Sequence, residues 1–303
     1  MKQHVAVLMG GPSAEHDVSV KSGQAAVAAL RRAGMSVSPV EFREGDPHLP
    51  VNTAVAFLAL HGKYGEDGTV QQWLERRGIP YTGSGVEASA RAFDKAATKE
   101  AFFVAGIRTP NYVVVERDVR PLAQLPMPVV VKPARQGSSV GVTIVRDRDE
   151  LDRAVKHAWR FDDRLVVEEF VAGRELTVGV LDGMPLPVVE IRFKGKLFDF
   201  EAKYSPGGAE EIVPAPLEAL TTVRAQDLAL AAHECLGCRD YSRTDMILMA
   251  DGTLQVLEVN TLPGLTEASL LPKAAQAAGL SMEALCTRMV EMALARRPVA
   301  VAA

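Results

Sequence analysis

The sequence lacks several features that would each assign it to a particular class of protein. It has only three cysteines in 303 residues, and a small odd number does not build a disulfide framework. No apolar run approaches the ~20 residues that cross a bilayer. The first apolar run, Val5–Met9, is too short for the core of a signal peptide. We therefore set secreted, membrane-spanning and collagen-like proteins aside and expect a cytoplasmic protein.

An excess of basic charge is also absent. The 34 Lys and Arg against 38 Asp and Glu give a net charge of −4, so no overall field attracts nucleic acid or an anionic membrane. Neither the Walker A pattern GxxxxGK[ST] nor the dinucleotide pattern GxGxxG occurs. We expect no nucleic-acid or membrane partner, and an NAD-dependent dehydrogenase is disfavoured.

The composition that is present, 48% apolar and 24% charged residues, is typical of a soluble globular protein. At ~150 residues per domain the length suggests about two domains. The first part alternates strand and helix patterns, which indicates an α/β fold with a parallel sheet. The expected strands are 4–9, 36–42 and 54–60, and the expected helices are 18–30 and 70–77. Ligands bind beyond the carboxyl ends of strands in such sheets.

The rest of the chain indicates two further groups of elements with an α+β character. The first has one or two helices in 87–106, strands at 112–115, 129–132, 142–145 and 165–170, and a helix at 150–159. The second has strands at 175–181, 186–193, 243–249 and 254–259, a loop at 198–214, and helices at 217–235 and on to about 296. No internal repeat is present.

A glycine- and serine-rich loop follows the strand that ends at Lys132. Small residues at Gly137, Ser138 and Ser139 let backbone N–H groups approach an anion, and the lysine adds a point charge. This pattern favours phosphate binding. A hairpin with a solvent-exposed lysine is the alternative.

Two later strands carry polar side chains that alternate with apolar ones. Side chains at i and i+2 share a face of a strand, so Arg243 lies beside Asp245, and Glu258 lies beside Asn260. If the strands pair, three oxygen donors and an arginine converge. Such donors suit Mg²⁺ bridging nucleotide phosphates, whereas a solvated sheet face is the alternative.

Weaker signals stand elsewhere, each with a plain structural explanation. The segment 168–175 reads as a hinge whose backbone and carboxylates could contact a nucleoside, or as surface charge. Gly264 could donate its N–H to an oxyanion, and Ser269 could bind a carboxylate or simply cap a helix. Glu15 could pair with a cationic substrate or with a helix dipole. Cys235 and Cys238 have no second ligand pair, so free thiols are favoured over zinc.

Taken together, these motifs resemble the ATP-grasp superfamily and, within it, the D-alanine–D-alanine ligase family, over about residues 4–295. The matching segments are 10–16, 61–69, 132–141 and 258–264, in the family's order. The resemblance implies an ATP-grasp fold with an N-terminal parallel-sheet domain. It implies three domains rather than two: 1–93 on the substrate side, 94–172 as the central ATP-grasp subdomain, and 173–303 with the metal and substrate sites.

The resemblance also implies roles for individual residues. For ATP, it implies contacts from Lys95, Lys132, Ser139, Glu168, Val171 and Glu175, with Lys203 at the transferred phosphate. For metal, it implies Asp245, Glu258 and Asn260 as ligands of two Mg²⁺ ions, with Mn²⁺ as an alternative. For the substrates, it implies Glu15, Ser138 and Tyr204 at the first D-alanine, Arg243 and the Gly264 N–H at the oxyanion, and His61, Ser269 and Leu270 in the substrate site.

The implied reaction joins two D-alanines through an acyl phosphate and releases ADP and phosphate, for peptidoglycan synthesis by a homodimer. A D-alanyl-D-lactate ligase or another ATP-grasp carboxylate–amine ligase is the first alternative, and the Lys203-Tyr204 pair favours D-alanine over D-lactate. A nucleotide-binding module without catalysis is a further alternative.

Overall fold

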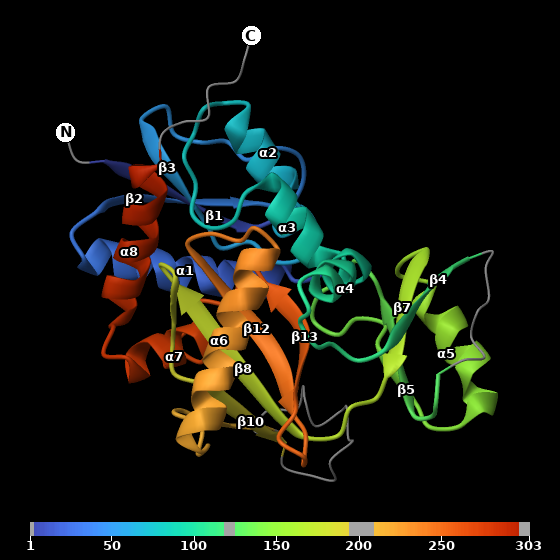
Figure 1. Ribbon diagram of the computed structural model, residues 1–303. Coiled ribbons are helices and arrows are strands. Elements are labelled where there is room, and N and C mark those ends of the chain that lie inside the picture. Colours follow the sequence, from blue (N-terminus) through green and yellow to red (C-terminus); the bar gives the residue numbers. More distant parts are fainter. Residues whose placement is uncertain (1–2, 118–124, 194–208, 297–303) are drawn as a thin grey trace.

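A three-stranded parallel sheet forms the first part of the molecule (Figure 1). The structure is a computed structural model that describes residues 3–117, 125–193 and 209–296. The strand order is β2-β1-β3, and the apolar run of β1 is buried on both faces, as expected for the middle strand of a parallel sheet. The elements of this part are β1 (His4–Gly10), α1 (His16–Arg32), β2 (Ser36–Phe42), β3 (Thr53–Leu58), α2 (Thr69–Glu75) and α3 (Val86–Phe93).

A four-stranded antiparallel sheet, in the order β4-β7-β5-β6, forms the second part. Helix α5 packs on this sheet through a small core that includes Val131, Val155 and Val167. The elements are α4 (Lys95–Val104), β4 (Tyr112–Glu116), β5 (Val129–Pro133), β6 (Thr143–Val145), the 3₁₀ turn η1 (Arg148–Glu150), α5 (Leu151–Ala158) and β7 (Arg164–Glu169).

A larger antiparallel sheet, in the order β11-β10-β8-β12-β13 with β9 beside β8, forms the third part. Helix α6 shares an apolar core with one side of this sheet, and α7 packs against β8 in the core that the third part shares with the first. The elements are β8 (Arg174–Leu181), β9 (Met184–Pro185), β10 (Val189–Phe193), β11 (Ala209–Ile212), α6 (Ala219–Cys235), β12 (Tyr241–Leu248), β13 (Leu254–Asn260), α7 (Leu270–Ala277) and α8 (Met282–Ala295).

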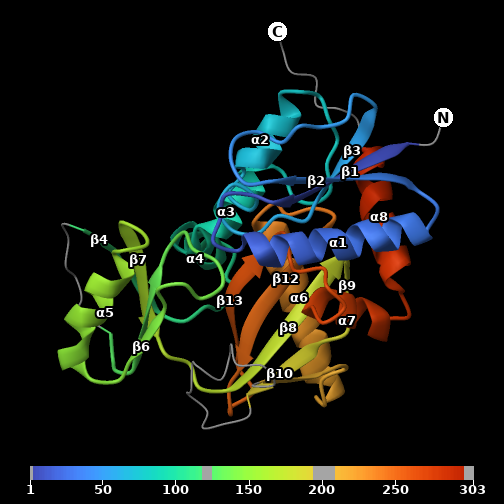
Figure 2. The ribbon, with the colours of Figure 1, turned by 180° about the vertical axis from the view of Figure 1, so that it is seen from behind.

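The first and third parts share one continuous apolar core. Residues of β1, β3, α1, β8, α7 and α8 belong to the same buried cluster, and Figure 2 shows α1 lying across the molecule beside α7 and α8. Polar contacts join the same two parts, because the Gly83 N–H donates to Asp240 (2.9 Å) and the Arg239 guanidinium donates to the Gly83 carbonyl (3.0 Å). The second part projects to one side in both views.

The structure confirms the predicted α/β class and refines two of the expected elements. The helical stretch 87–106 divides at Asp94, whose extended backbone ends α3 and whose carboxylate caps α4 by accepting from the N–H groups of Ala96 and Ala97. The predicted loop 198–214 contains strand β11, which pairs with β10. Turn residues at Pro206-Gly207-Gly208 indicated a loop, whereas pairing with β10, the preceding strand in the element order, makes the residues of β11 extended.

The longest helices of the described residues, α1 and α6, have 17 residues each. No helix in those ranges combines the length and apolarity that crossing a bilayer requires.

Candidate active site

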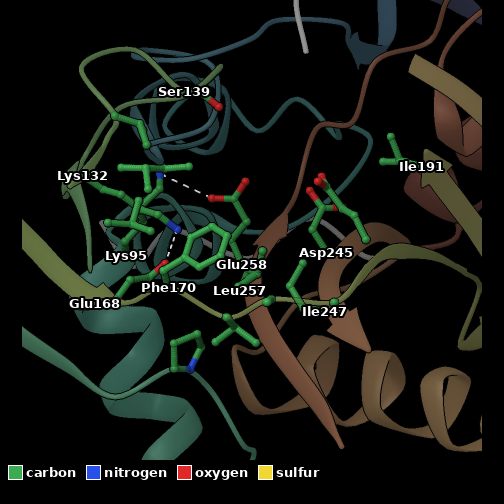
Figure 3. Close-up of a pocket in the computed structure, with 18 of the residues that line it drawn as sticks. Lys95, Lys132, Ser139, Glu168, Phe170, Ile191, Asp245, Ile247, Leu257 and Glu258 are labelled. Atoms are coloured by element: carbon green, nitrogen blue, oxygen red, sulfur yellow. Dashed lines mark ion pairs between the residues drawn. The ribbon is translucent and has the colours of Figure 1, made fainter. Parts of the chain in front are cut away.

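A cavity of about 510 Å³ lies between the second and third sheets. Strands β5, β6 and β7 line one side, and β8, β10, β12 and β13 line the other. Figure 3 shows Lys132 and Glu168 on one side of this space and Asp245 and Ile191 on the other. Nine of the residues predicted from the sequence line this cavity: Lys95, Lys132, Ser138, Ser139, Glu168, Val171, Glu175, Asp245 and Glu258. Residues that are up to 163 positions apart in the chain therefore face one space.

A buried cluster of two lysines and one glutamate forms the wall of the cavity on the second sheet. Lys132 on β5 makes an ion pair with Glu168 on β7, and Lys99 on α4 approaches the other carboxylate oxygen at 2.8 Å. Burial raises the pKa of Glu168, but the ammonium groups of Lys132 and Lys99 outweigh it and hold that pKa below its ordinary value. Burial lowers the pKa of Lys99. The cluster therefore keeps a carboxylate ionised at the inner end of the cavity.

Lys95 connects the glycine- and serine-rich loop with the third sheet. Its Nζ donates to the Gln136 carbonyl (2.6 Å) and lies 3.5 Å from a Glu258 carboxylate oxygen. Figure 3 marks this ion pair and the one between Lys132 and Glu168 with dashed lines. Two cationic side chains thus flank the loop at the place where a polyphosphate would need them.

The loop also reaches the first part of the molecule. The Ser138 hydroxyl donates to the Glu15 carboxylate, and Ser138 and Ser139 both adopt left-handed backbone conformations. A Cβ atom added at Gly137 or at Gly62 would lie 2.7 Å from Glu15 Oε2. The Glu15 carboxylate therefore lies against two glycine backbones, and a Cβ atom at either position would require the carboxylate to shift.

Arg243, Asp245 and Glu258 meet across the pairing of β12 and β13. Asp245 lies opposite Glu258, and Arg243 lies opposite Asn260. The Arg243 guanidinium donates to both Asp245 oxygens (2.9 and 2.8 Å), and the Thr177 hydroxyl also donates to Asp245 (2.6 Å). Burial lowers the pKa of Arg243, but the Asp245 charge and hydrogen bonds outweigh this and raise it. The arginine is a permanent cation here.

His61 and Gly264 lie on the side of the site nearest the first sheet. Burial lowers the pKa of His61 to about 4, with a smaller contribution from the nearby Arg243 charge. Ser269 precedes α7, but its side chain does not cap that helix. It accepts from the Thr266 N–H (3.1 Å), and a Cβ added at Gly264 would lie 2.8 Å from the Ser269 Oγ. The Gly264 backbone and the start of α7 are thus adjacent.

Two family models match the chain, one described as the D-ala D-ala ligase N-terminus over residues 41–84 and one as the D-ala D-ala ligase C-terminus over residues 102–291. A D-alanine–D-alanine ligase of Syntrophotalea carbinolica is 46% identical over 299 residues, covering 98% of each chain. The chain belongs to the D-alanine–D-alanine ligase family. The Granulibacter bethesdensis member is 45% identical over 303 residues, covering 97% of this chain and 99% of that one.

Solved structures of the D-alanine–D-alanine ligase family show the same fold. The Bacillus anthracis D-alanine–D-alanine ligase superposes with a TM-score of 0.87 at 39% identity, covering 96% of this chain and 97% of that one. A structure of the same ligase complexed with ATP gives a TM-score of 0.85 at 36% identity with the same coverage. The VanG D-Ala:D-Ser ligase of Enterococcus faecalis gives 0.87 at 28% identity, covering 96% and 99%. The ATP-grasp fold, ATP binding and ligase activity that the resemblance implied are therefore confirmed for this chain.

The comparison with the cavity lining does not reach every predicted residue of this ligase. Lys203 and Tyr204 lie outside the described residues, as does most of the predicted loop 198–214. The remaining predicted residues are not among those that line the cavity: Glu15, His61, Arg243, Asn260, Gly264, Ser269 and Leu270.

Two charged residues of the site were missed by sequence reasoning. Lys99 lies one helical turn after Lys95, so the i, i+4 spacing already indicated a shared helix face. Glu66 is buried near Glu15, and its Oε2 accepts from the Gly62 N–H (2.5 Å). Burial and the Glu15 charge raise the pKa of Glu66 to about 8. Nothing in the loop sequence indicated that Glu66 is buried.

The three cysteines are free thiols. Cys235 and Cys238 are partly buried at the end of α6, and burial raises the pKa of Cys238 to about 12. The neighbouring His233 pairs with the Ser242 hydroxyl (2.7 Å).

Proposed function

We propose that this ligase joins two D-alanine molecules to D-alanyl-D-alanine while ATP is converted to ADP and phosphate. One observation carries the proposal: the cavity that presents Lys95 and Lys132 also presents Asp245 and Glu258, and its serine loop bonds to Glu15. A phosphate-binding region thus adjoins a carboxylate suited to a substrate ammonium group. The relatives that cover nearly the whole chain carry the same activity in their names.

ATP would lie along the cavity with its base at the inner end. Glu168 and the backbone at Val171 would contact adenine, and Glu175 would contact the ribose. The phosphates would then meet Lys95, Lys132 and the Ser139 loop, with Lys203 at the group that is transferred. The hydrogen bond from Lys95 to the Gln136 carbonyl of the loop, and the place of both lysines in the cavity lining, support this orientation.

Asp245, Glu258 and Asn260 would hold two Mg²⁺ ions, with Mn²⁺ as an alternative. In the described part of the chain no cluster of three His, Cys, Asp or Glu side chains is arranged to hold a metal by itself. The donors instead fit the usual Mg²⁺ site, which combines one or two carboxylates with phosphate oxygens. When bound, Mg²⁺ offsets the charge of the transferring phosphoryl group.

In the first step, a carboxylate oxygen of one D-alanine attacks the γ-phosphorus. The bond between the γ-phosphorus and the β,γ-bridging oxygen breaks, so that ADP leaves with that oxygen and the D-alanine becomes an acyl phosphate. Glu15, supported by Ser138 and Tyr204, would hold the ammonium group and so orient the attacking carboxylate. The hydrogen bond from the Ser138 hydroxyl and the close approach of Gly62 and Gly137 to the Glu15 carboxylate support this role.

In the second step, the amine of another D-alanine attacks the acyl carbon, and phosphate leaves as the amide forms. Arg243 and the Gly264 N–H would stabilise the negative charge that develops on the carbonyl oxygen. Ser269 and the Leu270 N–H, at the start of α7, would bind the carboxylate of the attacking D-alanine. His61 would complete this part of the substrate site.

We further propose the division into domains at 1–93, 94–172 and 173–303, because each range contains one of the three sheets. We also propose that the ligase acts in the cytoplasm, in the synthesis of peptidoglycan precursors, and that it does so as a homodimer.

The decisive experiment measures ADP release with Mg-ATP and identifies the product by mass. The arms are D-alanine, L-alanine, and D-alanine with D-lactate or D-serine as the second substrate. ADP released with D-alanine and a D-alanyl-D-alanine mass support the proposal. A depsipeptide at neutral pH, or ATP binding without turnover in any arm, contradicts it.

A further inference from the structure

Ser22 forms a bridge between the first part of the molecule and the loop that carries Gly264. It lies on α1, and its side chain is fully buried. Its hydroxyl lies 3.1 Å from His61 Nε2 and accepts from the Leu265 N–H at 3.3 Å. Ser22 and Leu265 are 243 positions apart in the chain, so this bridge exists only in the folded protein.

The imidazole of His61 is the other partner of the Ser22 hydroxyl. Burial, the larger effect, lowers the pKa of this ring to about 4, while the Leu262 backbone raises it. The ring is therefore neutral near pH 7, and the Ser22 hydroxyl, which can donate or accept, pairs with Nε2 in either tautomer. The Leu265 N–H, the Ser22 hydroxyl and the His61 ring are thus joined in one chain of contacts.

The Leu265 N–H that Ser22 binds directly follows Gly264 in the chain. Leu262 and Leu265 are themselves almost fully buried, so the segment between them is held by packing at both ends and by the bridge at Leu265. The segment between them carries the N–H that would meet the oxyanion, and it adjoins Ser269. A small displacement of this segment would move both groups that act on the second substrate.

We propose that Ser22 is a positioning residue for the second half of the reaction: by joining the Leu265 N–H to His61, it holds the Gly264 segment in place for the attacking D-alanine. The inference rests on the proposed function. Ser22 does not touch substrate, since its side chain is fully buried, and its effect passes through His61 and the Leu265 backbone.

Ser19 offers a matched control. It lies one turn earlier on α1 and is also fully buried, but its hydroxyl donates to the Ala59 carbonyl and accepts from the Gly10 N–H, both at 2.8 Å. These partners belong to the first part of the molecule. Loss of the Ser19 hydroxyl should therefore lower the melting temperature without separating the two half-reactions.

The test compares S22A, S22C and S19A in the full chain. Ligation is measured at varied D-alanine, and the first half-reaction is measured by exchange of the β,γ-bridging oxygen of ATP in the presence of D-alanine. In S22A we expect kcat to fall about 10- to 100-fold, a part of the 10²–10³ that complete loss of an oxyanion donor costs. The KM for the second D-alanine should rise, while oxygen exchange and the KM for ATP change less than about threefold.

S22C keeps a weak donor of similar size and should show the same separation at smaller amplitude. The double variant S22A/H61Q should lose less than the product of the two single losses, because both residues act through one bridge. Wild-type ligation kinetics in S22A and S22C, equal losses in both half-reactions, additive losses in the double variant, or the same separation in S19A would each overturn the inference. Failure of the wild-type chain to form D-alanyl-D-alanine would instead overturn the proposed function.

Discussion

Replacement of Lys99 by methionine should destabilise the second part of the molecule. Methionine has nearly the same length but no charge, so the change removes the ammonium group and little volume. That group now contacts Glu168 (2.8 Å), the Thr109 hydroxyl (2.6 Å) and the Tyr112 ring (5.2 Å to its centroid). Without it, a carboxylate that is 2% exposed keeps Lys132 as its single cationic partner within this cluster.

The size of the loss in unfolding free energy follows from the burial of the Lys99–Glu168 ion pair. Removing one partner of a buried ion pair costs about 3–5 kcal/mol, because the other charge is left uncompensated. The lower value of about 3 kcal/mol applies, since Lys132 still faces Glu168. At roughly 2–4 °C per kcal/mol for a chain of this size class, the melting temperature should fall by roughly 6–12 °C.

Calorimetry tests this prediction by comparing the melting temperature of K99M with that of the control variant K95M. The Lys95 ammonium faces the cavity, and its carboxylate partner Glu258 is partly exposed, so K95M should cost no more than about 1 kcal/mol while it reduces ATP turnover strongly. The double variant K99M/E168Q should regain part of the stability that K99M loses. A K99M melting temperature within 2 °C of wild type, or an equal loss in K95M, would refute the reasoning.

Three further predictions concern the site. Glu258→Ala should reduce ADP release by at least about 100-fold and weaken the Mg²⁺ dependence, and near-wild-type turnover would remove Glu258 from the metal site. Glu66 holds a proton in the folded chain up to a pKa of about 8, whereas an unfolded glutamate titrates near 4.5. The contribution of the protonated Glu66 to stability is thus full below pH 4.5 and lost as the pH rises to 8. In denaturant titrations over that window, the unfolding free energy of wild type relative to Glu66→Gln should fall by about 1.4 kcal/mol per pH unit. A difference in unfolding free energy that does not change with pH contradicts this. Gly137→Ala would place a Cβ 2.7 Å from the Glu15 Oε2 and should raise the KM for the first D-alanine with little change in melting temperature, while Gly85→Ala, whose nearest neighbour lies at 3.6 Å, should leave that KM unchanged.

Local patterns in the sequence were sufficient for most of the fold and for part of the site. The period of two along β12 correctly placed Arg243 beside Asp245, which the guanidinium binds with two hydrogen bonds. The glycine- and serine-rich loop after Lys132 does line the cavity. Both features depend on residues that are close together in the sequence, where the local backbone geometry determines which side chains lie near one another.

The tertiary structure decided what depends on register and on burial. The pairing of Asp245 with Glu258, and the bulge beside it, follow from how β12 and β13 align. The paired lysines at Glu168, the raised pKa of Glu66 and the bridge from Ser22 to Leu265 arise because distant segments exclude water from these groups. A sequence pattern shows which residues share a face, but desolvation by a partner that lies far along the chain determines their charge and their hydrogen bonds.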